Sequence, residues 1–255
     1  MKKTRIILCG ACGKMGGNVL SLLASDDEAT AVCGVDLYPR EIGIPVYPSF
    51  ADVTEEADVI IDFSSPVELK ERLEYAKAHK LGIVLASTGF TQEDLALIQE
   101  YSKSIAIFKT ANLSLGVNLM QALCKAAAEV LGDSFDVEIV EKHHNLKKDA
   151  PSGTALMLAD TVNEAFAGQK RYVNGRDGIV GAREKSEIGI HAVRGGTIVG
   201  EHEVIFAGED EIITISHSAR SKRVFAVGAI RAAKYLPKKG AGMYEMKDLL
   251  AEENS

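Results

Sequence analysis

The sequence of 255 residues contains no apolar run close to the roughly 18 residues that a membrane-spanning helix needs. Positive charge is in the minority, because 36 acidic residues outnumber 29 lysines and arginines and the net charge is -7. Such a chain is poorly suited to binding the phosphate backbone of a nucleic acid as its main function. The 46% hydrophobic and 25% charged fractions are ordinary for a globular protein and argue against global disorder. We therefore expect no membrane partner and no nucleic-acid partner.

Cysteine is also scarce, with four residues at positions 9, 12, 33 and 124. Cys9 and Cys12 have CxxC spacing, but no second such pair follows, so we expect no metal site. We interpret all four as reduced thiols of a cytoplasmic protein. The first ten residues are basic and then apolar, as in a signal peptide. The apolar run ends within a few residues and no cleavage-type site follows, so we expect no signal peptide.

In the first part of the chain, short apolar runs alternate with amphipathic helical segments. We predict strands at 5–9, 30–36, 58–63, 82–87 and 104–108, with helices at 14–24, 67–79 and 91–102. Pro66 would lie near the first turn of the second helix, and Thr91 is a candidate N-cap for the third. This order predicts an α/β domain whose parallel sheet has helices on both faces.

The pattern changes near residue 115. A long helix is followed by a strand over 136–143, a helix over 154–166 and three further strands at 187–194, 198–207 and 211–219. Strands that follow one another so closely predict a second, α+β domain with a mixed or antiparallel sheet. A helix over 223–235 could return to the first domain. The predicted domains are thus 1–114, completed by 223–255, and 115–222.

Three glycines, Gly10, Gly13 and Gly16, follow the first predicted strand and open the first helix. Glycine permits a tight turn and a close approach of the backbone to a pyrophosphate, and the helix N-terminus supplies free N–H groups. The spacing is GxxGxxG, not the stricter GxGxxG, so the alternative is a plain strand-to-helix turn. We predict that the first domain is Rossmann-like and binds a dinucleotide.

Asp36 ends the second predicted strand, where a carboxylate can accept hydrogen bonds from both ribose hydroxyls. This position favours NADH over NADPH. Lys14 and Arg40 could nevertheless reach a 2′-phosphate, and the alternative for Asp36 is an ordinary cap of a turn.

The stretch EKHHNLKKDAPSGTA, residues 141–155, combines a proton donor, a cation and an anion site. His143 and His144 should point to opposite faces at the end of the strand. Lys147 lies on the loop that follows, and free N–H groups and hydroxyls at the start of the next helix can bind an anion. A substrate that bears a carboxylate fits this set, with histidine as the proton donor. The alternatives are a basic surface loop before a routinely capped helix, and a zinc site, which two adjacent histidines rarely form.

The other histidines stand singly in helix or strand patterns, and we expect them to be structural: His79, His191, His202 and His217.

Several motifs together resemble the 4-hydroxy-tetrahydrodipicolinate reductase family, the dihydrodipicolinate reductases of lysine and diaminopimelate synthesis. The resemblance covers almost the whole chain. HHNLKKDAPSGTA looks like the signature of the family and GACGKMG like its cofactor loop, and the other matching motifs, in order, are DFSSP, STGF, ANLSLGVN, RGGTIVGEH and GMYEMKDLL.

The resemblance implies roles for individual residues. His143 would be the general acid, and Lys147 would act in catalysis and in substrate binding. The residues implied to hold the substrate carboxylates are His144, Lys147, Ser152, Gly153 and Thr154. The residues implied to bind the cofactor are Gly10, Ala11, Cys12, Gly13, Lys14, Met15, Asp36, Ala86, Ser87, Thr88, Ala111, Asn112, Leu113 and Ser114. The resemblance also implies a homotetramer that assembles through the sheets of the second domains.

Three positions depart from the family pattern. Lys14 stands where arginine is usual, and a point charge can weaken phosphate or adenine contacts that a planar guanidinium makes. Ala86 stands where glycine is usual and could crowd the cofactor, and Lys222 stands where an arginine is expected near the substrate.

The function implied is reduction of 4-hydroxy-tetrahydrodipicolinate, or dihydrodipicolinate, to tetrahydrodipicolinate by NADH or NADPH. Two alternatives remain open on the residues. One is another two-domain dehydrogenase that acts on an amino acid, and the other is an NAD-binding sensor without activity.

Overall fold

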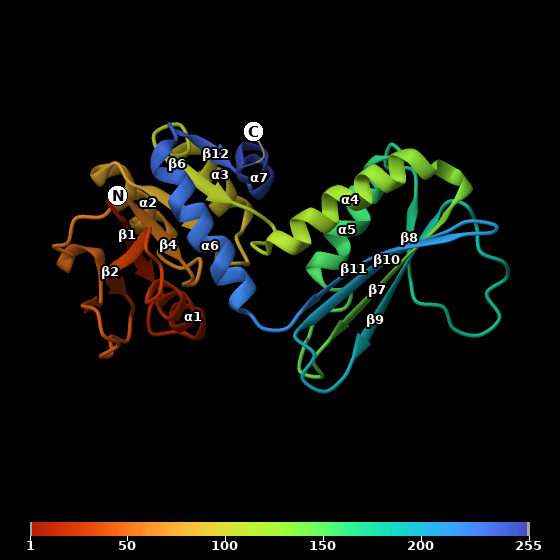
Figure 1. Cartoon of the computed structure of the whole chain (residues 1–255), viewed down its shortest axis with the longest axis horizontal. Coiled ribbons are helices and arrows are strands. Elements are labelled where there is room, and N and C mark those ends of the chain that lie inside the picture. Colours follow the sequence, from red (N-terminus) through yellow and green to blue (C-terminus); the bar gives the residue numbers. More distant parts are fainter. Residues whose placement is uncertain (1, 254–255) are drawn as a thin grey trace. The chain divides into compact units, whose positions relative to one another are not determined.

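The computed structural model describes residues 2–253. The chain folds into two compact units, one made of Met1–Ser114 with Lys222–Ser255 and the other of Leu115–Ser221 (Figure 1). The first unit is therefore built from two separate stretches of the chain, and the second unit is one continuous stretch.

The first unit contains a parallel sheet of seven strands in the order β12-β6-β5-β4-β1-β2-β3. The strands are β1 (Thr4–Cys9), β2 (Ala29–Val35), β3 (Val46–Tyr47), β4 (Val59–Asp62), β5 (Gly82–Leu85), β6 (Ala106–Lys109) and β12 (Gly242–Tyr244). β1, β4 and β5 are apolar and almost wholly buried, as strands covered on both faces should be. The predicted Rossmann-like parallel sheet is confirmed.

Helices cover both faces of this sheet. They are α1 (Lys14–Leu23), α2 (Leu69–His79), α3 (Gln92–Tyr101), α6 (Arg223–Tyr235) and α7 (Met246–Glu253), with short 3-10 turns at Phe50–Asp52 and Leu236–Lys238. α1 packs against α6 on one face, and α2 packs against α3 on the other. Thr91 caps α3 as predicted, in a capping box with Asp94.

Most boundaries lie within two residues of the prediction, one shifted helix start has a clear cause, and two strands of this unit were not predicted. The second helix begins at Leu69 and not at residue 67, because Glu68 has a left-handed backbone (φ 67°) that breaks the helical path. The N–H of Leu69 instead closes a turn onto the carbonyl of Pro66. The edge strands β3 and β12 were missed, since two or three residues are too few to show an alternating pattern.

The second unit contains a five-stranded mixed sheet in the order β11-β10-β7-β9-β8. The strands are β7 (Asp136–His143), β8 (Arg171–Asn174), β9 (Glu187–Arg194), β10 (Gly200–Ala207) and β11 (Ile212–Ala219). β7 pairs antiparallel with β10 and parallel with β9. The predicted mixed sheet is confirmed, although the short strand β8 was missed.

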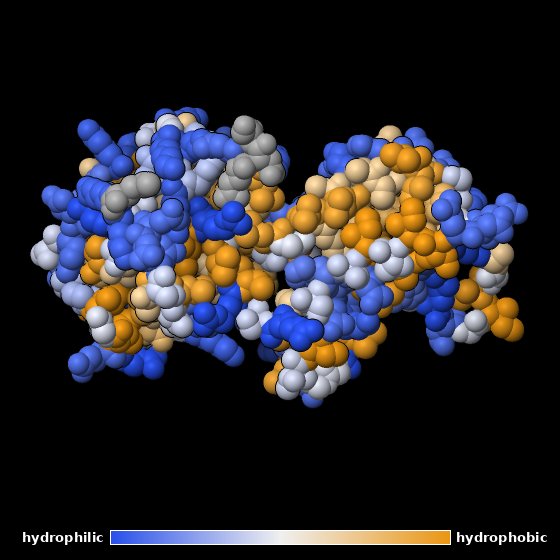
Figure 2. Space-filling view, in the orientation of Figure 1, coloured by the Kyte–Doolittle hydropathy of each residue, from blue (hydrophilic) through white to orange (hydrophobic). Residues whose placement is uncertain are grey.

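Two helices, α4 (Leu115–Leu131) and α5 (Gly153–Glu164), pack on one face of this sheet. Burial alternates along β7, so that the residues facing the helices are Val137, Ile139, Glu141 and His143. Glu141 and His143, at the end of this apolar row, therefore lie on the face of the sheet that the helices cover. The exposed apolar side chains of α4 are Leu119, Leu123 and Val130. Figure 2 shows hydrophobic surface along this helix.

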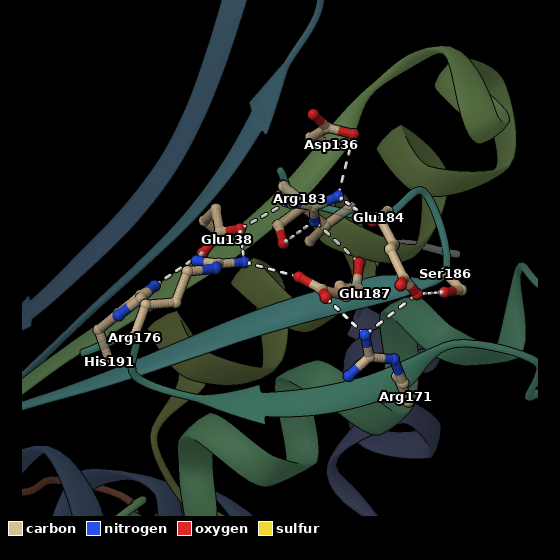
Figure 3. Close-up of polar contacts among 10 residues, drawn as sticks. Asp136, Glu138, Arg171, Arg176, Arg183, Glu184, Ser186, Glu187 and His191 are labelled. Atoms are coloured by element: carbon tan, nitrogen blue, oxygen red, sulfur yellow. Dashed lines mark hydrogen bonds and ion pairs between the residues drawn. The ribbon is translucent and has the colours of Figure 1, made fainter. Parts of the chain in front are cut away.

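The opposite face of the sheet has a network of ion pairs centred on Glu138 (Figure 3). Its carboxylate receives hydrogen bonds from Arg176 (3.0 and 2.9 Å) and Arg183 (2.8 Å), and it pairs with His191 at 2.7 Å. Arg183 also reaches Asp136 and three backbone carbonyls. These contacts fasten both ends of the segment 175–186 to the sheet.

Candidate active site

The glycine turn of the first unit connects β1 to α1. Gly10 has a left-handed backbone (φ 72°), and an added Cβ would lie 3.0 Å from the backbone of Phe63, the residue after β4. Gly13 is the N-cap of α1 and has no side chain to occupy the free N–H groups. A Cβ at Gly16 would collide with the carbonyl oxygens of Gly10 and Ala11. Gly10 and Gly16 are therefore required by backbone conformation or by close approach, and Gly13 leaves the helix end open.

This turn lies where the strand order reverses, since β2 is on one side of β1 and β4 is on the other. In open α/β sheets, ligands bind at the carboxyl edge at such a switch point. A pocket of about 240 Å³ opens there, and its lining includes Gly10, Asp36, Leu37, Tyr38 and Ser64.

The Asp36 carboxylate follows β2 and bridges two backbone segments. It accepts hydrogen bonds from the N–H of Cys12 at 2.9 Å and of Tyr38 at 3.0 Å. Each carboxylate oxygen has more than one lone pair, so these bonds leave room for ribose hydroxyls. Arg40 lies on the same side and donates to the carbonyl of Cys12 at 3.4 Å.

A buried ion pair supports the wall of this pocket. Arg72 of α2 lies 3.0 Å from Asp62 at the end of β4, and both side chains are almost completely buried. Arg72 also donates to the carbonyl of Ser65, and Asp62 accepts from the N–H of Ser64 at 2.9 Å. The pair thereby fixes the two serines that follow the strand. The prediction from sequence named neither charged residue, although DFSSP contains Asp62.

The remaining predicted cofactor residues follow β5 and β6 in the first unit. The N–H of Ala86 bonds to the carbonyl of Asp62, and the hydroxyl of Ser87 is buried with no partner in the described part of the chain. Leu113 and Ser114 are buried, while Thr88 and Ala111 are exposed. The open end of α1, the glycine turn and the Ser87 hydroxyl fit a dinucleotide. These features suit NADH and NADPH equally.

The polar stretch of the second unit begins on the inner face of β7. His143, the last residue of the strand, is 9% exposed, and its Nδ1 lies 2.6 Å from Oε2 of Glu141. Because β7 ends there, His144 belongs to the following loop and does not continue the alternation of the strand. Nδ1 of His144 is buried without a hydrogen-bond partner among residues 2–253, which leaves it free to meet a ligand.

The loop after β7 carries the predicted lysines. Lys147 is mostly buried and forms an ion pair of 2.9 Å with Asp149, whereas Lys148 is exposed. The loop is fastened to the Gly195–Gly196 turn, since the N–H of Asn145 bonds to the carbonyl of Gly196. A cis peptide bond precedes Pro151.

The predicted anion site lies at the start of α5, and its three residues differ in burial. Ser152 is 2% exposed; its hydroxyl caps the N–H of Ala155 at 3.2 Å and contacts His202 at 3.0 Å. Its own N–H donates to Glu141. Ser152 therefore shapes the helix end from inside, because these contacts use its polar atoms. Gly153 is exposed, and Thr154 is half-buried.

Three residues that reasoning from sequence left out of the site belong to it. Glu141 is fully buried and receives both arms of Arg194 at 2.7 Å, and His202 contacts Ser152. Burial lowers the pKa of His202 to about 4, so this ring is neutral at pH 7. Glu141 had a detectable signal, because an acid two residues before His143 on a strand shares its face. Arg194 and His202 come from other strands; they begin and end the motif RGGTIVGEH, which resembles the family but was given no role in the site.

Two further findings concern the described residues only. Within residues 2–253, no three or more His, Cys, Asp or Glu side chains are grouped to hold a metal ion. Over the same range, every helix is too short or too polar to cross a bilayer.

Comparison with known proteins places the chain in a family. A family model described as the N-terminus of dihydrodipicolinate reductase matches residues 4–113, and the model of its C-terminus matches residues 116–250. The 4-hydroxy-tetrahydrodipicolinate reductase of Caldanaerobacter subterraneus subsp. tengcongensis is 51% identical over 246 residues, which cover 96% of this chain and 98% of the relative. The enzyme of the same name from Clostridium botulinum is 44% identical over 247 residues, with the same two coverages, 96% and 98%.

A solved structure agrees in fold. The dipicolinate-bound dihydrodipicolinate reductase of Paenisporosarcina sp. TG-14 superposes with a TM-score of 0.79 at 24% identity, covering 96% of this chain and 98% of that chain. At this identity the likeness supports the fold alone. The matches to both family models and to the two relatives show that this chain belongs to the dihydrodipicolinate reductase family.

Proposed function

We propose that this protein reduces 4-hydroxy-tetrahydrodipicolinate, or the dihydrodipicolinate derived from it, to tetrahydrodipicolinate in lysine and diaminopimelate synthesis. The reductase activity follows from the family, whose relatives have this name over nearly the full length of the chain. The observation in the structure that best supports the activity is that Glu141 joins His143 to Ser152 at the start of α5, at the two ends of the loop that carries His144 and Lys147. Such a set suits a cyclic dicarboxylate.

The two units would divide the work. We propose that the first unit holds the cofactor at the glycine turn, whose free N–H groups face a pyrophosphate. A nicotinamide cofactor held there would supply the hydride. His143 would donate the proton that completes the reduction, and water leaves when the ring bears the 4-hydroxyl group. Lys147 and the N–H groups that begin α5 would neutralise the carboxylates and the charge that develops on the ring.

Asp36 favours NADH in this proposal. A 2′-phosphate would approach an oxygen pair that already accepts hydrogen bonds from Cys12 and Tyr38, and like charges would repel. Arg40 on the same side partly offsets this repulsion. We therefore expect both cofactors to work, with NADH preferred.

A homotetramer formed through the sheets of the second units is also part of the proposal. Large apolar side chains remain exposed on or beside this sheet, among them Ile212 (68%), Ile179 (106%) and Val193 (45%). Burial of such residues against another copy would stabilise an assembly. Light scattering coupled to size exclusion tests this, and a monomer at micromolar concentration would contradict it. The four unpaired thiols fit a reducing cytoplasm.

The decisive experiment follows the oxidation of NADH, and separately of NADPH, while a synthase makes the unstable substrate from pyruvate and aspartate semialdehyde. Rapid oxidation that depends on the synthase supports the proposal. Binding of NADH without turnover would favour a sensor, and oxidation driven by an amino acid or its keto acid would favour another dehydrogenase.

A further inference from the structure

A carboxylate with no exposed surface, Glu141, connects the parts of the polar site in the second unit. Its Oε1 accepts hydrogen bonds from Arg194 at 2.7 Å and from the N–H of Ser152 at 2.9 Å. Its Oε2 accepts from the other arm of Arg194 at 2.7 Å and lies 2.6 Å from Nδ1 of His143. One buried group therefore contacts the proposed general acid, the N-cap of α5 and the neighbouring strand β9.

The ionisation of Glu141 decides which nitrogen of His143 can act. Burial works to raise the pKa of Glu141, but hydrogen bonds from Arg194, His143 and Ser152 outweigh it and hold that pKa below its usual range. An ionised carboxylate can only accept hydrogen bonds, so Nδ1 of His143 must carry the hydrogen. Nε2 is then the nitrogen that gains and loses the catalytic proton. The tautomer is assigned here from the hydrogen-bond network.

The charged groups around the His143 ring differ in sign, and Glu141 is its anionic contact. Two other titratable groups lie close by: Arg194 on β9, which is paired with Glu141, and His202 on β10, whose ring centroid is 5.2 Å from that of His143. Lys147 on the loop acts electrostatically on His202. Arg194 and Lys147 are cations and disfavour an imidazolium. His202 adds no negative charge, and Asp149 is paired with Lys147. Among the described residues, Glu141 is the acidic side chain in direct contact with the ring.

The same carboxylate aligns the proton donor with the proposed substrate cradle. Its bond to the N–H of Ser152 fixes the residue that caps α5. Arg194 extends the network, because it also donates to the carbonyl of Asp149 at 2.7 Å, on the loop that carries Lys147. A displacement of Glu141 would therefore move the imidazole relative to the helix end.

We infer that Glu141 is the positioning residue of this active site: it holds His143 as the Nδ1–H tautomer, stabilises the imidazolium that donates from Nε2, and fixes that ring relative to the start of α5. Glu141 does not itself touch the substrate. The inference rests on the proposed function for its kinetic consequences, although the tautomer can be measured without turnover.

The kinetic test compares the wild type with Glu141→Gln. Because the amide cannot stabilise a cation, we expect kcat to fall about 10- to 100-fold, while the Kd for NADH stays within about twofold. The limb of the kcat profile that falls as pH rises should move to lower pH by about one unit or more, since the acid loses its proton more easily. Wild-type kcat with an unmoved profile would overturn the inference.

A matched control lies on the same strand. Glu138 is three residues earlier, on the opposite face of β7. Like Glu141 it pairs with one histidine, and it pairs with two arginines where Glu141 pairs with one. Glu138→Gln should leave the pH profile of kcat unchanged. If this variant reproduced the loss and the shift of Glu141→Gln, a general effect on the sheet would explain both and the inference would fail.

Glu141→Gln leaves the Arg194 guanidinium without its partner and can impair folding. The double variant Glu141→Gln/Arg194→Met removes both charges and avoids this difficulty. It should bind NADH normally and retain the low kcat and the shifted profile. Recovery of wild-type kcat and profile in the double variant would show that only the unpaired charge had mattered, and would overturn the inference. Glu141→Asp keeps the charge but shortens the side chain. Its pH profile of kcat should therefore be closer to that of the wild type than its kcat value is.

A spectroscopic measurement separates this inference from the proposed function. In protein labelled with ¹⁵N-histidine, His143 is assigned from the signal missing in His143→Gln. We expect the neutral ring to be the Nδ1–H tautomer in the wild type and in Glu138→Gln, and to lose that preference in Glu141→Gln. A wild-type Nε2–H tautomer would overturn the inference. Absence of turnover in the wild type would sink the proposed function and leave the tautomer result standing.

Discussion

The two units place their candidate sites by different means. In the first unit the backbone forms most of the site: a left-handed glycine, an uncapped helix end and glycines that permit close packing at the carboxyl edge of a parallel sheet. In the second unit charged side chains from several strands form it, joined through the buried Glu141. The first arrangement should fail through steric change, and the second through loss of a charge or a proton.

The largest effect that we expect concerns the proton donor in the second unit. His143→Gln should lower kcat at least about 100-fold, because amides do not act as acids near neutral pH. The glycine turn should be unaffected, so the Kd for NADH, measured by fluorescence titration, should match the wild type. Turnover close to that of the wild type would remove His143 from this role. Weakened NADH binding would contradict the division of work between the units.

A steric change tests the first unit. A Cβ at Gly16 would meet two backbone carbonyl oxygens that cannot move independently. Gly16→Ala should therefore destabilise this unit by about 1–3 kcal/mol and raise the Kd for NADH about tenfold or more. Thermal unfolding and NADH titration measure both quantities.

The adjacent glycine provides the control. Gly17 also lies in α1, but nothing is within 4 Å of where its Cβ would be. Gly17→Ala should be neutral or should stabilise the helix by up to about 1 kcal/mol, since alanine has the higher helix propensity. Equal damage from both variants would show that helix packing in general, and not the close approach at Gly16, controls the turn.

The same contrast explains what the sequence predicted. The parallel sheet and the glycine turn were predictable because buried strands are short apolar runs and because the three glycines are neighbours in the chain. Strand β7 occupies the predicted residues, Asp136–His143. Arg194 and His202 begin and end the motif RGGTIVGEH, but the motif does not reveal their contacts, since they reach Glu141 and Ser152 through the pairing of β9 and β10 with β7. Burial of Ser152 likewise depends on tertiary packing.

A smaller effect is expected from the cation on the loop. Lys147→Met keeps the length of the side chain and removes the charge, so KM should rise about tenfold with a smaller change in kcat. Lys148→Met, one residue later and exposed, is the matched control and should stay within about twofold of the wild type. Both variants lose one positive charge, so the ratio of their kcat/KM values measures how much the position of Lys147 contributes to catalysis. Unchanged substrate affinity in Lys147→Met would contradict a lysine that binds carboxylate.

The smallest effect concerns the network around Glu138, which lies on the face opposite the active site. Burial works to raise the pKa of this carboxyl, but hydrogen bonds from Arg176, Arg183 and His191 lower it from 4.5 to about 2. A lowered pKa means that the network stabilises the folded state fully above about pH 4.5 and loses this contribution as pH falls towards 2. We expect the protection of amides in β7 and β9, taken relative to the intrinsic exchange rate at each pH, to fall over that interval by the equivalent of about 1–2 kcal/mol, a value reduced for partial solvent screening. Glu138→Gln should flatten this dependence, and the exposed Glu209→Gln should not. Strands of the first unit should exchange alike in all three proteins, and a parallel change there would mean that the units do not respond separately to acid.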